Sequence, residues 1–286
     1  MKVSYYPGCS LDGTAKEYGA STEAVARLLG IELEELADWS CCGASSAHAT
    51  SDTLAEILPA RNLEIASKAG LDLVVPCAAC FQRLKAADKK LSADETSGGI
   101  SGKYESNFQI KYLVDFFWDA IGGKKFKEIV KTPLHNLSAV CYYGCLAVRP
   151  PWITDARNPE DPQEMDNIMK SLGADVKNWS YKTECCGGSL MITHQSIAMK
   201  LTARLFDMAI EAGAECIIAG CPECLMNLDN QQASISRDTG RNYNLPVFYF
   251  TELMGLSLGS PSSEVEKWLG AHLVDPRPLL KQKGLL

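Results

Sequence analysis

The sequence predicts an α/β protein made of two pseudo-symmetric repeats, each a small, mostly parallel sheet flanked by helices. Five cysteines occur twice in the same order, and the segments around them are repeated as well. Short apolar runs alternate with helical patterns of roughly 12–18 residues, as in parallel sheets covered by helices. The repeat period of about 140 residues is too long for a solenoid unit. It indicates duplication of a whole domain.

Each cysteine set consists of a lone cysteine, a Cys-Cys-Gly pair and a Cys-x-x-Cys motif. The first set is Cys9, Cys41, Cys42, Cys77 and Cys80, and the second is Cys145, Cys185, Cys186, Cys221 and Cys224. In both sets, 34 residues separate the pair from the Cys-x-x-Cys motif. Cys141 and Cys216 fall outside the pattern, and we expect both to be small buried hydrophobic residues.

The first repeat predicts strands and helices in alternation. We expect strands at 3–6 and 71–75 and helices at 14–29, 52–68, 78–90 and 112–121. Ser51 or Asp52 caps the second helix, Gly70 ends it, and Pro59 predicts a kink inside it. Residues 92–106 are rich in Ser, Gly and charge and predict a loop.

The second repeat predicts the same order. We expect strands at 138–143, 215–219 and 247–250, and helices at 162–172, 194–212, from 222 onward and at 251–256. The periodicity breaks between 122 and 137, which predicts domains at 1–130 and 131–286. Cys77 and Cys221 each follow a predicted strand, at the sheet edge where ligands bind in such folds.

Composition and charge exclude several classes of protein. The net charge of −7, without a basic block, argues against a nucleic-acid partner. The sequence has no apolar stretch of the ~18–20 residues needed to cross a bilayer, so we expect no transmembrane segment. The N-terminus has no secretory pattern, which predicts a cytoplasmic protein. Thiols in a reducing compartment favour metal binding over disulfides.

The cysteine spacing favours iron–sulfur chemistry. Side chains of adjacent cysteines diverge, so a Cys-Cys pair serves a tetrahedral single-metal site poorly but can reach different irons of one cluster. Five thiols per repeat also exceed the four that zinc or a cubane cluster takes. We expect Gly43 and Gly187 to let the backbone approach bulky inorganic sulfur. Structural zinc, in one half or throughout a protein without a redox role, remains the alternative.

These motifs resemble the duplicated Cys-Cys-Gly (CCG) domain found in the B subunit of heterodisulfide reductases and, more distantly, electron-transfer subunits of glycolate, lactate and glycerol-3-phosphate oxidation systems. The resemblance covers nearly the whole chain. It implies two 4Fe–4S clusters of a non-cubane type, one per half. By resemblance, Cys9, Cys41, Cys42, Cys77 and Cys80 hold one cluster, and Cys145, Cys185, Cys186, Cys221 and Cys224 hold the other.

The chain lacks the C-x2-C-x2-C-x3-C run of bacterial ferredoxins. Its absence favours resemblance to the stand-alone catalytic B subunit of heterodisulfide reductase, an oxidoreductase that reduces or forms a disulfide between two clusters. The resemblance implies two partner proteins, a ferredoxin-like C subunit and a flavin-containing A subunit. A chain that only relays electrons within a dehydrogenase or oxidase complex is the alternative function.

Other residues have a functional and an ordinary interpretation. His48 and His194 follow the Cys-Cys-Gly motifs and are candidate proton donors, although a histidine at a helix start is the simpler interpretation. The insertion at 149–162 is either a rigid surface loop or a substrate gate. We expect the two Cys-Cys-Gly segments to converge on an apolar cleft rimmed by these histidines and this loop. Residues 275–286 predict a plain surface tail rather than a docking segment.

Overall fold

The computed structural model describes residues 1–44, 46–93 and 104–286 and contains two four-stranded sheets. The first half contains β1 (Lys2–Tyr5), α1 (Gly8–Asp12), α2 (Lys16–Leu28), β2 (Glu32–Glu35), α3 (Ser46–Thr50), α4 (Asp52–Ala69), β3 (Leu73–Val75), α5 (Ala78–Ser92), β4 (Ile110–Tyr112) and α6 (Leu113–Ile129). The second half contains β5 (Ser138–Tyr142), α7 (Pro151–Thr154), α8 (Glu164–Ser171), β6 (Asp175–Val176), the 3-10 turn η1 (Gly188–Leu190), α9 (Gln195–Glu211), β7 (Cys216–Ala219), α10 (Pro222–Thr239), β8 (Val247–Tyr249), α11 (Phe250–Leu258), α12 (Ser262–Leu269) and α13 (Arg277–Gln282).

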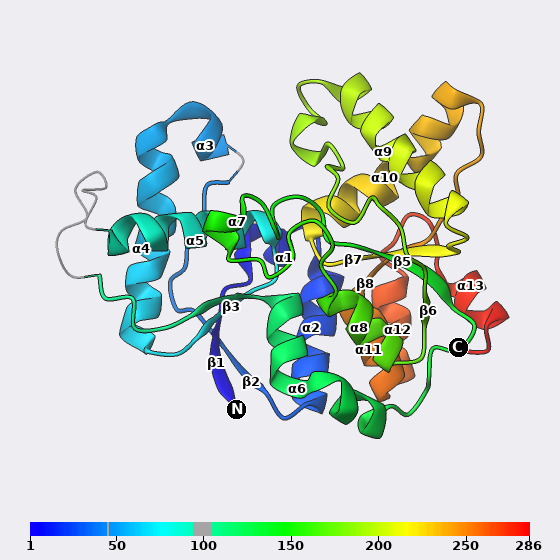
Figure 1. Cartoon of the computed structure of the whole chain (residues 1–286), viewed down its shortest axis with the longest axis horizontal. Coiled ribbons are helices and arrows are strands. Elements are labelled where there is room, and N and C mark those ends of the chain that lie inside the picture. The colour runs from blue at the N-terminus through cyan, green and yellow to red at the C-terminus, as the bar shows by residue number, and fades with distance from the viewer. Residues whose placement is uncertain (45, 94–103) are drawn as a thin grey trace.

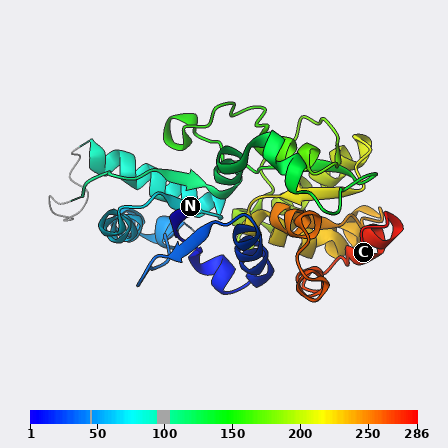
Figure 2. The ribbon, with the colours of Figure 1, turned by 90° about the horizontal axis from the view of Figure 1, so that it is seen from below.

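The two sheets have the same topology. Their strand orders are β2-β1-β3-β4 and β6-β5-β7-β8, and every pairing is parallel. The predicted α/β architecture of two similar repeats is therefore confirmed. The sheets lie side by side along the long axis of the molecule (Figures 1 and 2). The predicted division into domains at 130/131 remains a prediction.

Helices from one half pack on helices from the other. α2 packs on α11, and α6 packs on α8, so the two pairs are related by the pseudo-symmetry (Figure 1). Tyr18 of α2 stacks on Tyr249, with ring centroids 4.1 Å apart, and the Ser21 and Thr251 hydroxyls lie 2.7 Å apart. All four side chains are buried. The halves therefore share an interior rather than touching only at their surfaces.

The structure differs from the sequence prediction at several short elements. β2 and β6 were not predicted, because edge strands such as Glu32–Glu35 are held by backbone pairing and carry no apolar alternation. α1, α3 and α7 were not predicted either, since each has only four or five residues. The three-residue β4 was also missed, and α6 resumes after a break at Gly122. α4 continues through Pro59. Most of the predicted loop at 92–106 lies outside the described residues.

The expectation of a plain C-terminal tail is wrong. Residues 277–282 form α13, and Leu280 is fully buried. The Lys283 ammonium also forms an ion pair with Glu215, at 2.6 Å. The segment therefore belongs to the folded second half.

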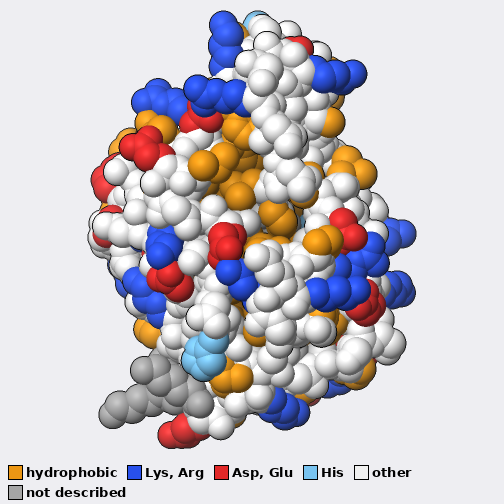
Figure 3. Space-filling model, turned by 90° about the vertical axis from the view of Figure 1, so that its right-hand side faces the viewer, with side chains coloured by type: hydrophobic (Ala, Val, Ile, Leu, Met, Phe, Trp, Pro, Cys, Tyr) orange, Lys and Arg blue, Asp and Glu red, His pale blue; other side chains and the backbone are white. Residues whose placement is uncertain are grey.

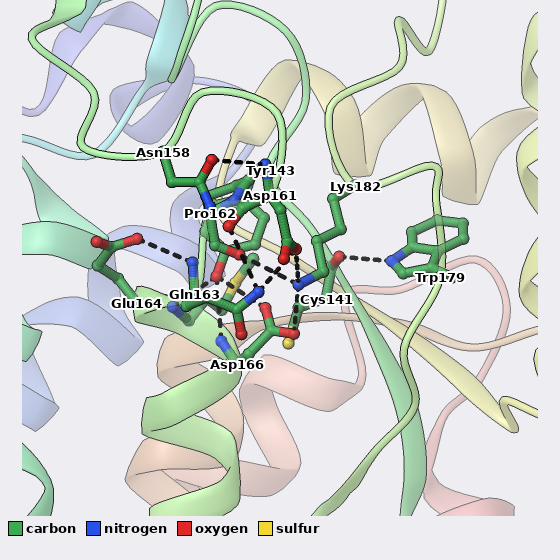
Figure 4. Close-up of polar contacts among 11 residues, drawn as sticks. Cys141, Tyr143, Asn158, Asp161, Pro162, Gln163, Glu164, Asp166, Trp179 and Lys182 are labelled. Carbon is green, nitrogen blue, oxygen red and sulfur yellow. Dashed lines mark hydrogen bonds and ion pairs between the residues drawn. The ribbon is translucent and has the colours of Figure 1, made fainter.

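A buried ion pair fixes the start of α8 (Figure 4). The Lys182 ammonium lies 2.9 Å from the Asp166 carboxylate and 2.8 Å from that of Asp161, and the Lys182 and Asp166 side chains are 3% and 2% exposed. The Tyr143 hydroxyl donates a hydrogen bond to Asp166 and accepts one from the backbone of Met165. Burial would lower the pKa of Lys182, but hydrogen bonds to Asp161 and Asp166 raise it above its usual value.

Replacing Asp166 with alanine is expected to lower the free energy of unfolding by about 3–5 kcal/mol, because it leaves the buried Lys182 without its charge partner. Urea denaturation of the purified protein measures the change. Asp175→Ala is the control: Asp175 pairs with Lys177 at the surface, and its loss is expected to cost less than about 1 kcal/mol. Equal effects of the two substitutions would contradict this account of the buried pair.

Candidate metal centre

All ten cysteines of the duplicated pattern line one cavity of about 160 Å³. Figure 3 shows hydrophobic side chains gathered in a hollow on one face of the molecule. The two Cys-Cys-Gly segments therefore converge, as the sequence predicts. Cys141 and Cys216 lie elsewhere, fully buried in strands, and the expectation for both is confirmed.

The Cys-x-x-Cys motifs lie at equivalent places in the two halves. Cys77 follows β3 and is the N-cap of α5, and Cys221 follows β7 and is the N-cap of α10. This is the predicted position at the carboxyl ends of the strands. A helix N-terminus stabilises a thiolate, because the unpaired amides of the first turn attract negative charge.

The remaining cysteines approach these helix ends from loops. The sulfur atoms of Cys42 and Cys80 are 3.1 Å apart, and those of Cys186 and Cys224 are 3.7 Å apart. The thiols of Cys77 and Cys221 interact with each other across the two halves. The two sets therefore meet at one point.

The lone cysteines and the first cysteine of each pair lie nearer the surface. Cys9 and Cys185 are exposed, and Cys41 and Cys145 are half-buried. The sulfur atoms of Cys9 and Cys41 are 3.8 Å apart. Each set thus runs from the buried Cys-x-x-Cys motif outward to the cavity mouth.

Two glycines are required by backbone conformation and close packing. Gly187 has φ +78°, and a side chain there would bring its Cβ within 2.8 Å of the Ala198 backbone. Gly144 has φ +71°, and its Cβ would lie 2.9 Å from the Cys224 sulfur. The glycine of the Cys-Cys-Gly motif therefore makes room for the following helix, and its expected approach to inorganic sulfur stays a prediction. The glycine before the lone cysteine is the one that faces a thiol.

Interactions among the thiols shift their pKa values in opposite directions. Interactions with the Cys41 and Cys80 thiols lower the pKa of Cys42, and an interaction with the Cys145 thiol lowers the pKa of Cys185 to about 6. Interactions with the Cys224 and Cys77 thiols also lower the pKa of Cys221. Each half therefore stabilises a thiolate, the form that binds metal.

Tyrosines that the sequence analysis did not single out position the cysteine pairs. The Tyr6 hydroxyl donates to the carbonyl of Ser40, next to Cys41, at 2.7 Å. The Tyr142 hydroxyl makes the equivalent bond to Glu184, next to Cys185, also at 2.7 Å. The repeated tyrosine shortly before each Gly-Cys was a visible signal for this role.

The two halves differ in how they support the Cys-Cys pair. In the second half, the Asn227 amide donates to the Cys186 carbonyl at 2.6 Å, and the Thr202 hydroxyl donates to the same oxygen at 2.9 Å. Three residues after Cys80, the position equivalent to Asn227 is Arg83. Its half-buried guanidinium interacts electrostatically with Cys42 and has no hydrogen-bond or ion-pair partner within residues 1–44, 46–93 and 104–286. The first set is therefore the more positively surrounded of the two.

The structure does not bring the two candidate histidines to the cavity. His48 is exposed on α3, and His194 is exposed at the N-cap of α9. Neither lines the cavity wall. The expectation of a cleft rimmed by both is therefore not met, because each Cys-Cys-Gly segment turns away from the cavity before its histidine.

The insertion at 149–162 ties the two halves together instead of covering the cavity. Asp155 pairs with Lys85 of α5 at 2.6 Å, and Arg157 pairs with Asp119 of α6 at 2.7 Å. No residue of the insertion lines the cysteine cavity. The geometry thus supports a strap between the halves and gives no support to a gate.

Two other features are absent from the described part of the chain. No three His, Cys, Asp or Glu side chains there form a ready site for one metal ion. No helix in that part is long and apolar enough to span a bilayer.

Comparison with known proteins agrees with this architecture. The CCG cysteine-rich domain matches residues 3–85 and 139–229. The 8-methylmenaquinol:fumarate reductase membrane anchor subunit of Wolinella succinogenes is 32% identical over 92% of this chain and 94% of that protein. The B subunit of a ferredoxin/F420H2-dependent CoB-CoM heterodisulfide reductase from Methanosarcina acetivorans is 24% identical over 92% and 91%.

A solved structure, a hypothetical protein from Helicobacter pylori, superposes with a TM-score of 0.72 at 13% identity. The match covers 96% of this chain and 52% of that one. The resemblance to the B subunit of heterodisulfide reductase is thereby confirmed at the level of relatives. The domain matches the chain twice, once over each sheet and its cysteine set. The chain therefore belongs to the CCG cysteine-rich domain family and carries that domain twice.

Proposed function

We propose that the chain is the iron–sulfur subunit of a heterodisulfide-reductase-type complex and reduces, or forms, a disulfide in the cysteine cavity. The observation that carries the proposal is the lining of one cavity by ten thiols from two repeats, with Cys77 and Cys221 in contact across them. A chain that only relayed electrons would have no need for both sets to face one opening.

The ten thiols fit two iron–sulfur clusters, one for each set. They lie on short loops and helix N-termini, and each set includes a stabilised thiolate. Cys9, Cys41, Cys42, Cys77 and Cys80 would hold one 4Fe–4S cluster of the non-cubane type, and Cys145, Cys185, Cys186, Cys221 and Cys224 the other. Clusters bound there would supply single electrons.

The reaction takes two electrons and two protons: R–S–S–R′ + 2e⁻ + 2H⁺ gives R–SH and R′–SH. The S–S bond breaks, and each sulfur gains one electron and one proton. The electrons would come from an iron–sulfur partner protein of the ferredoxin type, fed by a flavin-containing partner. The protein supplies the shape of the cavity and the two sets of thiols that line it. The expected cytoplasmic location remains a prediction.

An electron-transfer role without disulfide chemistry is the second candidate. It is favoured by the 32% identity to the fumarate reductase membrane anchor subunit of Wolinella succinogenes. Reduced methyl viologen as a one-electron donor and bis(2-hydroxyethyl) disulfide as a probe separate the two functions. Disulfide reduction consumes two viologen radicals for each disulfide and releases two thiols. A protein that accepts electrons from viologen without forming thiol would be a relay.

The anaerobically purified protein is expected to contain about eight irons and about eight acid-labile sulfides per chain, because both cysteine sets are complete. Colorimetric iron and sulfide assays with elemental analysis measure this. Cys216→Ala is the control, since that cysteine lies in β7 outside both sets, and its variant is expected to keep the full iron content. About four irons with one zinc would show that one half binds zinc instead.

The variants Cys42→Ser and Cys186→Ser are each expected to lose about half of the iron. Each half carries its own five thiols and its own sheet, so damage should remain local. Iron analysis and electron paramagnetic resonance spectra of the two variants test this. Loss of nearly all iron from either variant would mean that the ligand sets cross between the halves.

Arg83→Asn is expected to lower the midpoint potential of the first-half centre and to leave that of the second half unchanged. A positive charge near a cluster stabilises its reduced form, and Arg83 interacts with Cys42. A redox titration followed by electron paramagnetic resonance measures both potentials. Lys85→Asn, in the same helix but paired with Asp155, is the control. A variant with unchanged potentials would remove Arg83 from this role.

A further inference from the structure

The cysteine cavity is chemically unsymmetric, although its cysteines are repeated. Ser10 follows the lone Cys9, and the equivalent position after Cys145 is Leu146. Glu223 lies inside the second Cys-x-x-Cys motif, and the equivalent position in the first is Ala79. All four residues line the cavity. The polar pair Ser10 and Glu223 therefore corresponds, under the pseudo-symmetry, to the apolar pair Leu146 and Ala79.

The polar pair is joined across the two halves. The Ser10 hydroxyl donates a hydrogen bond to the Glu223 carboxylate at 2.7 Å, and Ser10 is buried. This is the single hydrogen bond to the Glu223 carboxylate within the described part of the chain. A carboxylate accepts about four hydrogen bonds, so most of its capacity is free. It can therefore accept a hydrogen bond from a bound ligand.

Glu223 is also the single carboxylate side chain that lines the cavity, as far as the structure describes the chain. Among the described residues, no lysine, arginine or histidine lies on the cavity wall to balance an anion. An anionic group entering the cavity would meet a carboxylate without a cation, and like charges at close range oppose binding. A neutral hydroxyl or amide donor would instead satisfy the free lone pairs of Glu223.

We propose, building on the function proposed above, that the cavity selects an uncharged, unsymmetric disulfide. One half of the substrate ends in a hydrogen-bond donor held by Glu223, and the other half is apolar and faces Leu146 and Ala79. Glu223 is thus a specificity-determining residue for charge, and the Ser10 hydrogen bond positions its carboxylate. The missing counter-charge selects against anionic disulfides, while the free lone pairs select for hydrogen-bond donors.

Two disulfides of similar length test the proposal: bis(2-hydroxyethyl) disulfide, which is neutral, and bis(2-sulfonatoethyl) disulfide, which carries two negative charges. The holoprotein is assayed with reduced methyl viologen, and binding to the oxidised protein is measured by isothermal titration calorimetry. We expect the neutral disulfide to have a kcat/KM and an affinity at least about tenfold higher. Glu223→Gln keeps the size and removes the charge, and it is expected to bring both ratios close to one.

Leu146→Lys supplies a second and independent variant. It places a cation on the apolar side and is expected to raise binding of the sulfonated disulfide while leaving the neutral one little changed. Glu32→Gln is the control, because Glu32 is exposed on β2 and its loss should leave both ratios unchanged. Iron content shows that each variant retains its clusters.

The possible outcomes separate this inference from the function beneath it. If no disulfide is reduced or bound by the wild-type holoprotein, the proposed disulfide chemistry is itself wrong. If both disulfides are reduced with similar kcat/KM, the chemistry stands and charge selection is overturned. Charge selection is also overturned if the wild type prefers the neutral disulfide but Glu223→Gln keeps the same preference.

Discussion

The arrangement of the cysteines depends on one backbone carbonyl, that of Gly220. It accepts hydrogen bonds from the Tyr18 hydroxyl at 2.8 Å and from the Tyr112 hydroxyl at 2.6 Å, both from the first half. Gly220 directly precedes Cys221, so these bonds fix the start of α10 against the first sheet. A side chain at Gly220 would lie 2.8 Å from the Tyr112 hydroxyl. Leaving a buried hydroxyl without a hydrogen-bond partner costs free energy, so the two tyrosines hold the Gly220 carbonyl in place. These bonds keep Cys221, the next residue, close to Cys77.

Duplication has not produced two equal sites. A pseudo-two-fold relation lets the two sets meet near its axis, but it does not require their surroundings to match. Asn227 holds the second Cys-Cys pair through its carbonyl, while Arg83 occupies the same position in the first half. Two further equivalent positions also differ in polarity: Ser10 corresponds to Leu146, and Ala79 corresponds to Glu223. The two repeats share the thiols and the tyrosine hydrogen bonds beside the Cys-Cys pairs, and they differ in the residues around them.

Much of this was predictable from sequence, and the failures have physical causes. Two β–α repeats and the strand-end positions of Cys77 and Cys221 followed from apolar runs and cysteine spacing, because buried parallel strands leave a strong local signal. The edge strand Glu32–Glu35 gave no such signal. His48 and the 149–162 insertion were expected at the cavity and lie away from it. Their positions depend on the direction in which the chain leaves the cysteines, which local sequence patterns do not encode. The Lys182–Asp166 pair joins residues 16 apart in sequence, so only the tertiary fold brings their charges together.

Charge balance gives the strongest reason to assign metal to this cavity. Ten thiols line it, and the Arg83 guanidinium interacts electrostatically with Cys42 of the first set. Several thiolates at close range repel one another, so without added positive charge most of these groups must remain protonated. Iron would supply that charge and displace the protons, which couples cluster binding to the pKa values of the thiols and to the stability of both halves. The negative charge of the cavity is thus balanced by the metal that it binds, and the Glu223 carboxylate adds to the negative charge that has to be balanced.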